Sequence, residues 1–221
     1  MNFKQLCTDL SKYANKQKAT EMAHLMGNTY AFKGLDSTAR AKVMEDQLAS
    51  DKEPEKLDWE FVECCWDQNI REFQYFALQY LSARRDLLQK QDLTKLKKLI
   101  VDKPGWDTNN ILHRLVNLLT ALHPDLGAKI LAWSQSDDPW LKRAAILHQM
   151  DRGIYADEEL LAQIWQNCLG DPHDFVQAAL VDSLKELHEN KADFVEAFLN
   201  QHETDLSSSI RQALCPGGCH E

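Results

Sequence analysis

Glycine and proline are scarce in this sequence. It has eight glycines and six prolines among 221 residues, where average usage of the two together is roughly 12%. This scarcity excludes a collagen-like or loop-dominated architecture and favours helices. No apolar run approaches the roughly 18–20 residues that span a bilayer, which excludes an integral membrane protein. The first residues, Met1 to Gln5, lack the apolar core of a secretory signal, so we expect a cytoplasmic protein.

Several motifs of enzyme chemistry are also missing. The sequence has no phosphate-cradling glycine loop, no G-x-G-x-x-G, no H-E-x-x-H and no Ser–His–Asp pattern, so we expect no cofactor. Its ending places Cys215, Cys219 and His220 at a spacing that can bind zinc, but a structural zinc site needs four ligands. We therefore expect no metal, and we interpret residues 215–221 as a flexible tail. The adjacent Cys64 and Cys65 lie in an apolar-periodic run and are interpreted as core thiols.

The charge balance is acidic. Asp and Glu number 34 and Lys and Arg number 25, which gives a net charge of −9. Duplex DNA repels such a protein unless cations gather on one face. Local basic clusters occur at Arg84-Arg85, Lys95 to Lys98 and Lys142-Arg143, and each is interpreted as a solvated helix face rather than a phosphate contact.

Apolar residues recur at helical spacing along nearly the whole chain, and large aromatic residues repeat at a longer interval. The aromatic residues stand at spacings of 33, 34 and 35, at Phe73, Trp106, Trp140 and Phe175. A period of about 33–47 residues made of two helices is typical of an α-solenoid of the HEAT type. Because no linker is visible, the sequence predicts one all-α domain over residues 1–221, with about six antiparallel helix pairs.

Asn110 stands out within this repeat. Four residues after each aromatic the other three units have an alanine, Ala77, Ala144 or Ala179, and this unit has Asn110. Asparagine is a poor helix former, and a buried amide needs hydrogen-bond partners. Asn110 is therefore either a satisfied amide inside the fold or a polar group that faces the groove of the solenoid. Trp106 likewise is either a core aromatic or a groove residue.

Five segments resemble the AlkD family of bacterial alkylpurine DNA glycosylases, in order and over essentially the whole chain. The family's amino-terminal MxxYMKxxFxFLGI element is similar to residues 22–35, and its REFQ element to Arg71–Gln74. Its WD[ST]VD element is similar to Trp106–Asn110, and its WLxRAAIL element to Trp140–Leu147. The last helices, from Phe175 to a closing Ser209–Ala213, are similar to FIxKAIGWxLREY and the segment after it.

The resemblance implies a HEAT-like fold and a concave groove that holds duplex DNA without flipping the damaged base. We also expect a monomer. It also implies five functional positions, of which Trp106 and Arg143 keep the family's residues. The other three depart from it. Asn110 stands at the catalytic aspartate, Asp182 at the second tryptophan and Leu25 at the tyrosine.

These departures bear on the chemistry. Excision of an alkylpurine passes through an oxocarbenium-like transition state, and removing a preorganised charge partner typically costs about 10²–10³ in rate. Asn110 is neutral and is not a base, and Asp182 adds negative charge near phosphates. We therefore expect a binding or scaffold protein of the DNA-alkylation-repair group with lost or strongly reduced glycosylase activity, which binds DNA weakly or a protein partner in its groove. The alternative is an active glycosylase for N3- and N7-alkylated purines, with Asp182 or Asp107 as the replacement carboxylate.

Overall fold

The computed structural model describes residues 1–51 and 54–214 of the chain. Within these residues it contains thirteen α-helices and no strand of a sheet; one isolated bridge joins Ala31 to Ile70. In the same ranges, no helix combines the length and the hydropathy that crossing a membrane requires. The prediction of an all-α fold is confirmed. Cys215, Cys219, His220 and the predicted tail lie outside the described residues.

The chain divides into two compact units, Met1–Gln89 and Lys90–Glu221. The described residues of the first unit form five α-helices and one short 3₁₀ helix. They are α1 (Phe3–Lys12), α2 (Lys16–Leu25), α3 (Ser37–Ser50), α4 (Trp59–Trp66), α5 (Arg71–Ala83) and η1 (Arg85–Leu87).

The second unit contains eight α-helices in its described part, with four 3₁₀ turns between or before them. The α-helices are α6 (Leu93–Val101), α7 (Trp106–Leu122), α8 (Gly127–Ser134), α9 (Pro139–Leu147), α10 (Glu158–Cys168), α11 (Asp174–His188), α12 (Ala192–Gln201) and α13 (Ser208–Leu214). The 3₁₀ turns are η2 (Lys90–Asp92), η3 (Pro124–Leu126), η4 (Gly153–Tyr155) and η5 (Glu203–Asp205).

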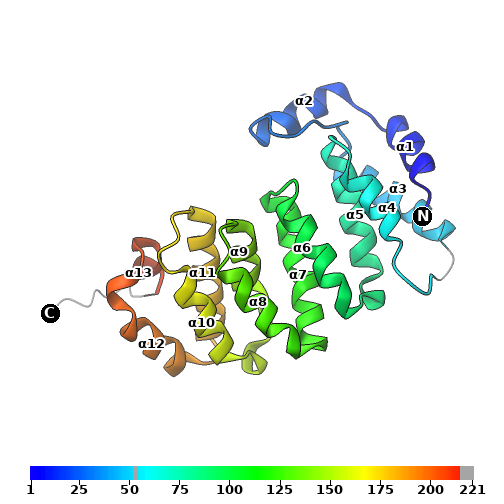
Figure 1. The fold of residues 1–221 in the computed structure, drawn as a ribbon. Coiled ribbons are helices and arrows are strands. Elements are labelled where there is room, and N and C mark those ends of the chain that lie inside the picture. The colour runs from blue at the N-terminus through cyan, green and yellow to red at the C-terminus, as the bar shows by residue number, and fades with distance from the viewer. Residues whose placement is uncertain (52–53, 215–221) are drawn as a thin grey trace. The chain divides into compact units, whose positions relative to one another are not determined.

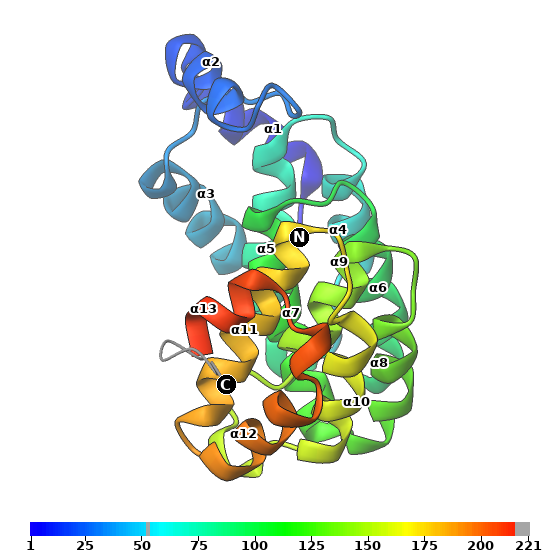
Figure 2. The same ribbon diagram turned by 90° about the vertical axis from the view of Figure 1, so that its left-hand side faces the viewer.

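The helices of the second unit stack as successive hairpins (Figure 1). Each hairpin pairs one helix with the next, as α6 with α7, α8 with α9 and α10 with α11. The second helices form one row, in which α7 packs on α9, α9 on α11 and α11 on α13; Figure 2 shows α13 beside α11. Since a single hairpin cannot bury its apolar face alone, this stacking produces the shared core of an α-solenoid.

Aspartate side chains cap the starts of several helices. Asp36 caps α3 by accepting from the Ala39 amide at 2.9 Å, and Asp138 caps α9 by accepting from the Trp140 amide at 2.9 Å. Asp171 differs, because α11 begins three residues later and His173 occupies the N-cap position without a side-chain cap. The Asp171 carboxylate instead binds Lys142 at 2.6 Å and His173 Nδ1 at 2.8 Å.

A buried polar side chain recurs once per repeat near the start of the second helix. It is Gln74, Asn109, Arg143 and Gln177, at spacings of 35, 34 and 34. Gln74 donates its Nε2 to the carbonyls of Cys65, Trp66 and Gln68. These are the carbonyls nine, eight and six residues earlier, where the preceding helix ends. We call this arrangement the carbonyl seal.

Gln177 repeats the carbonyl seal at the end of α10. Its Nε2 donates to the carbonyls of Cys168, Leu169 and Asp171, again nine, eight and six residues earlier. Helix ends leave carbonyls without intrahelical partners, so a side-chain donor satisfies groups that burial would otherwise penalise. Asn109 is one methylene shorter, and neither atom of its buried amide has a partner among the described residues.

The amino-terminal unit has a second anchor, which joins two of the segments that carry the family resemblance. The buried Glu72 carboxylate accepts hydrogen bonds from the backbone amides of Lys33, Gly34 and Leu35 at 2.7 to 3.2 Å. Gly34 has a φ of +85°, and a Cβ there would lie 2.1 Å from the Asn15 carbonyl oxygen. The turn therefore requires glycine at this position.

The carbonyl seal predicts a measurable stability difference. Gln177→Ala removes a donor from three carbonyls and should lower the free energy of unfolding by about 1–3 kcal/mol, the usual cost of leaving buried polar groups unpaired. Gln163→Ala is the matched control, because Gln163 is exposed in the middle of α10. It should change stability by less than about 0.5 kcal/mol. Urea unfolding followed by circular dichroism measures both; equal effects would contradict the seal.

Candidate functional site

Three aromatic rings from three helices meet in the second unit. Trp106 is the first residue of α7, Trp140 lies in the first turn of α9 and Phe175 in the first turn of α11. The Trp140 and Phe175 rings stack, with centroids 4.3 Å apart at 19°. Trp106 meets both edge-on, with centroids 6.4 Å from Trp140 and 6.1 Å from Phe175. The 33–35-residue spacing therefore marks positions that the fold brings together.

Arg143 lies at the centre of this cluster. Its guanidinium carbon lies 4.1 Å from the centroid of the Trp106 ring, a cation–π arrangement. Its Nη1 donates to the Phe175 carbonyl at 3.0 Å, and its Nη2 donates to Asn110 Oδ1 at 3.1 Å. Only 4% of the residue is exposed. The interpretation of Lys142-Arg143 as a solvated helix face is wrong, since Arg143 is buried and Lys142 is paired with Asp171.

Arg143 occupies the position of the carbonyl seal but does not act as one. Gln74 and Gln177 donate to carbonyls at the end of the preceding helix. Arg143 instead donates to Asn110 on α7 and to the Phe175 carbonyl at the start of α11. The longer, planar guanidinium can reach two neighbouring helices, which a glutamine cannot. We call Trp106, Asn110, Arg143 and Phe175 the arginine site.

Asn110 is exposed on α7 and bonded to the neighbouring helix α9, so it combines features of both sequence interpretations. It lies one turn after Trp106 on the same helix face. Trp106 is 47% exposed, so it is not a buried core aromatic. The arginine site is thus open to solvent on the α7 side, where the Trp106 ring and the Asn110 amide are accessible.

Asp182 contributes charge to this site from α11. It is exposed, and its carboxylate opposes the main influence on the Arg143 guanidinium, which is burial. Burial lowers the pKa of Arg143 to about 10, although the negative charge of Asp182 acts in the opposite direction. Arg143 therefore stays a cation at neutral pH.

Two further candidates from the sequence are Asp107 and Leu25. Asp107 is in the first turn of α7, where the helix dipole stabilises a negative charge. The N-cap residue of this helix is Gly105. Leu25 is the last residue of α2 in the amino-terminal unit and is 83% exposed. Its expected place beside the other four positions stays a prediction.

His113 belongs to the surroundings of the site, and sequence reasoning did not single it out. It lies on α7 seven residues after Trp106, and its Nδ1 donates to the Asn109 carbonyl at 3.1 Å. Burial lowers its pKa to about 4, with a further contribution from the charge of Arg143. Its spacing of three from Asn110 was the available signal, because that spacing puts both side chains on one helix face.

The comparisons with known proteins agree with one another. The family model described as DNA alkylation repair enzyme matches residues 6–214. No curated protein matches the chain. Among solved structures, the chain is similar to a predicted DNA alkylation repair enzyme from Enterococcus faecalis, with a TM-score of 0.81 and 19% sequence identity. That likeness covers 94% of this chain and 98% of the other, and at this identity it concerns the fold.

His113 predicts a pH dependence of stability. Its folded pKa of about 4 lies below the ordinary value of 6.5, so the unfolded state binds more protons between these values. The stability present above pH 6.5 is therefore lost as the pH falls toward 4, at up to about 1.4 kcal/mol per pH unit for one histidine. His113→Gln should reduce this slope, and His24→Gln, at an exposed position, should leave it unchanged. Urea unfolding at pH 7, 6 and 5 measures the slopes; a His113→Gln slope equal to that of the unmodified protein would refute the assignment.

Proposed function

Because the chain belongs to the family of DNA alkylation repair enzymes, we propose that it is an AlkD-like member that binds DNA weakly and has lost, or nearly lost, glycosylase activity. The observation that carries this proposal is Asn110, a neutral amide at the position where the family resemblance implies a catalytic carboxylate. The proposal includes a HEAT-like monomer of the bacterial cytoplasm that offers its groove to DNA or to a protein partner.

The electrostatics of the transition state explain why Asn110 matters. Breaking the glycosidic bond leaves positive charge on the sugar, and a preorganised carboxylate stabilises that charge. An amide oxygen carries only a partial charge and does not accept the proton of an attacking water. The loss of such a partner costs about 3–4 kcal/mol in the barrier.

The hydrogen bond from Arg143 bears on the aspartate variant. Arg143 Nη2 donates to Asn110 Oδ1 at 3.1 Å, so a carboxylate introduced at this position would form an ion pair with the guanidinium. The family resemblance implies the same arginine–aspartate pair in active members, so the pair itself is no obstacle. Restoring aspartate alone still leaves Asp182 and Leu25 where the resemblance implies aromatic residues.

Asp182 lowers the affinity of the arginine site for nucleic acid. It is an exposed carboxylate, and its charge reaches the guanidinium of Arg143. A tryptophan at this position would offer a flat apolar surface to the sugar and backbone, whereas a carboxylate repels phosphates. The net charge of −9 acts in the same direction at longer range.

An active alkylpurine glycosylase is the second candidate. The half-exposed Trp106 ring, held against a buried cation and two further aromatic rings, favours it because such a surface can contact a damaged nucleotide. In that case Asp182 or Asp107 supplies the carboxylate, and its asparagine variant abolishes activity. Base release from methylated DNA discriminates the two candidates.

The first functional prediction concerns base release. The unmodified protein should release little or no 7-methylguanine or 3-methyladenine from methylated duplex DNA, and Asn110→Asp should restore at most a trace. The triple variant Leu25→Tyr, Asn110→Asp, Asp182→Trp should release more than the three single variants added together, because groups that act as a unit are not additive.

Two controls accompany this assay. Asn200→Asp makes the same chemical change at an exposed position of α12 and should have no effect. Circular dichroism checks that each variant is folded. Robust turnover by the unmodified protein would overturn the proposal and turn attention to Asp182 and Asp107.

The second functional prediction concerns DNA affinity. At about 150 mM salt the protein should bind duplex DNA no more tightly than the non-specific range of about 10⁻⁴–10⁻⁶ M. Asp182→Asn should tighten binding by a few-fold, since it removes a like charge near the phosphates. Asp193→Asn removes an exposed carboxylate from α12 and serves as the charge-matched control. Fluorescence anisotropy measures these constants, and nanomolar affinity of the unmodified protein would contradict the prediction.

A further inference from the structure

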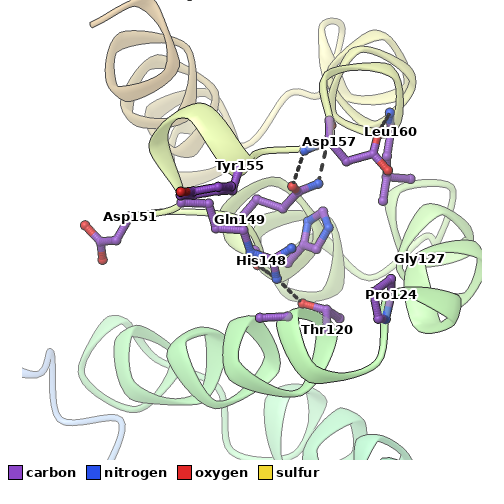
Figure 3. A pocket seen from close by; sticks show the side chains of 11 residues that line it. Thr120, Pro124, Gly127, His148, Gln149, Asp151, Tyr155, Asp157 and Leu160 are labelled. Atoms are coloured by element: carbon purple, nitrogen blue, oxygen red, sulfur yellow. Dashed lines mark hydrogen bonds between the residues drawn. The ribbon is translucent and has the colours of Figure 1, made fainter. Parts of the chain in front are cut away.

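A second concave site lies in the same unit and shares no residue with the arginine site. It is a cavity of about 370 Å³ between the end of α7, the start of α8, residues 148–157 and the first turn of α10 (Figure 3). Pockets for small ligands usually have volumes of about 300–1,000 Å³. The cavity therefore has room for one small molecule and excludes a folded segment or a duplex.

His148 presents an unused hydrogen-bond acceptor to this cavity. The residue is 1% exposed and lines the cavity, and Figure 3 shows its ring directed toward the side of Pro124 and Leu160. Its Nδ1 lies 2.6 Å from the Ala145 carbonyl oxygen, which can only accept, so Nδ1 carries the proton. Burial lowers the pKa of His148 to about 4, so the ring is neutral and Nε2 is an acceptor.

Nε2 of His148 has no hydrogen-bond partner among the described residues. This nitrogen does not belong to the fully buried side-chain atoms that lack a hydrogen-bond partner, so it is accessible from the cavity. A ligand that donates an N–H or O–H can therefore reach it.

Arg152 supplies a fixed donor to the same cavity. Its Nε donates to Asn117 Oδ1 at 2.8 Å, and its Nη2 donates to Thr120 Oγ1 at 2.6 Å and to the His148 carbonyl at 3.1 Å. These bonds hold the guanidinium in place, while Nη1 has no partner in the described part of the chain. The cavity thus combines a rigid acceptor with a rigid donor.

The remaining walls restrict the charge and shape of a ligand. Asp151 and Asp157 also line the cavity, and two carboxylates against one arginine disfavour an anion such as a phosphate. Pro124, Leu160 and the ring of Tyr155 provide apolar surface, and Tyr155 is 85% exposed at the rim, where Figure 3 shows its ring edge-on. An exposed ring at the rim favours a planar ligand that can stack on it.

We propose that this cavity binds an uncharged planar nitrogen heterocycle of the nucleobase or nucleoside kind, which donates an N–H to His148 Nε2 and accepts a hydrogen bond from Arg152. Each nucleobase carries a donor beside an acceptor on one edge, which matches this pair. The inference goes beyond the proposed function and does not depend on it, because the residues of the arginine site take no part in it.

The test titrates the full-length protein with adenosine, cytidine, guanosine and thymidine. Calorimetry measures affinity, and ¹⁵N NMR of labelled histidine reports on His148 Nε2. At least one nucleoside should bind with a Kd below about 1 mM and move the Nε2 resonance. Its 5′-monophosphate should bind several-fold more weakly, because of Asp151 and Asp157.

Two variants localise the binding. Ala121→Trp fills the cavity from an exposed lining position and should weaken binding at least about tenfold, which is about 1.4 kcal/mol. Ala128→Trp makes the same change at an exposed position of α8 that does not line the cavity, and it should bind like the unmodified protein.

Several outcomes would overturn the inference. One is that none of the four nucleosides binds with a Kd below about 1 mM. Others are binding that leaves the Nε2 resonance unmoved, binding that Ala121→Trp does not weaken, and tighter binding of the monophosphate. A crystal structure of the protein soaked with these nucleosides that shows only ordered water at His148 Nε2 would overturn it as well.

Discussion

The second unit is organised around one buried cation. Taking a guanidinium out of water costs several kcal/mol unless hydrogen bonds and aromatic faces replace its hydration. Arg143 obtains those replacements from α7 and α11 at once, through Asn110, the Phe175 carbonyl and the Trp106 ring. The contacts of this one guanidinium hold α7, α9 and α11, the second helices of three successive hairpins, together at the site.

The arginine site therefore has a structural role in addition to any chemical one. Two of its residues, Trp106 and Arg143, are those that the family resemblance carries over, and here they are in direct contact. The Glu72 anchor makes the same point in the other unit, because it joins the REFQ segment to the turn at Gly34. Similarity in these segments is evidence for the fold, and the positions that depart from the family, such as Asn110 and Asp182, are exposed.

Much of the fold could be predicted from the sequence because its signals are local. The aromatic spacing identified the repeat, and Asp36 and Asp138 cap the starts of α3 and α9 with hydrogen bonds inside one turn. The site was harder to predict, because burial of a side chain depends on neighbouring helices. Arg143 beside Lys142 has the local pattern of a solvated face, and only the packing of α7 and α11 against α9 makes it a core residue. The exposure of Asn110, at a position where other units have buried alanines, likewise depends on how the neighbouring helices pack.

The carbonyl seal also restricts the length of the connections between helices. Gln74 and Gln177 reach carbonyls at the same three distances along the chain, nine, eight and six residues earlier. An inserted residue between the last sealed carbonyl and the glutamine would shift the amide out of reach of all three. Connecting loops usually tolerate insertions and deletions. In these two hairpins the hydrogen bonds fix the length of the connection. Insertions and deletions, natural or engineered, are therefore expected in the loops at the opposite ends of the helices.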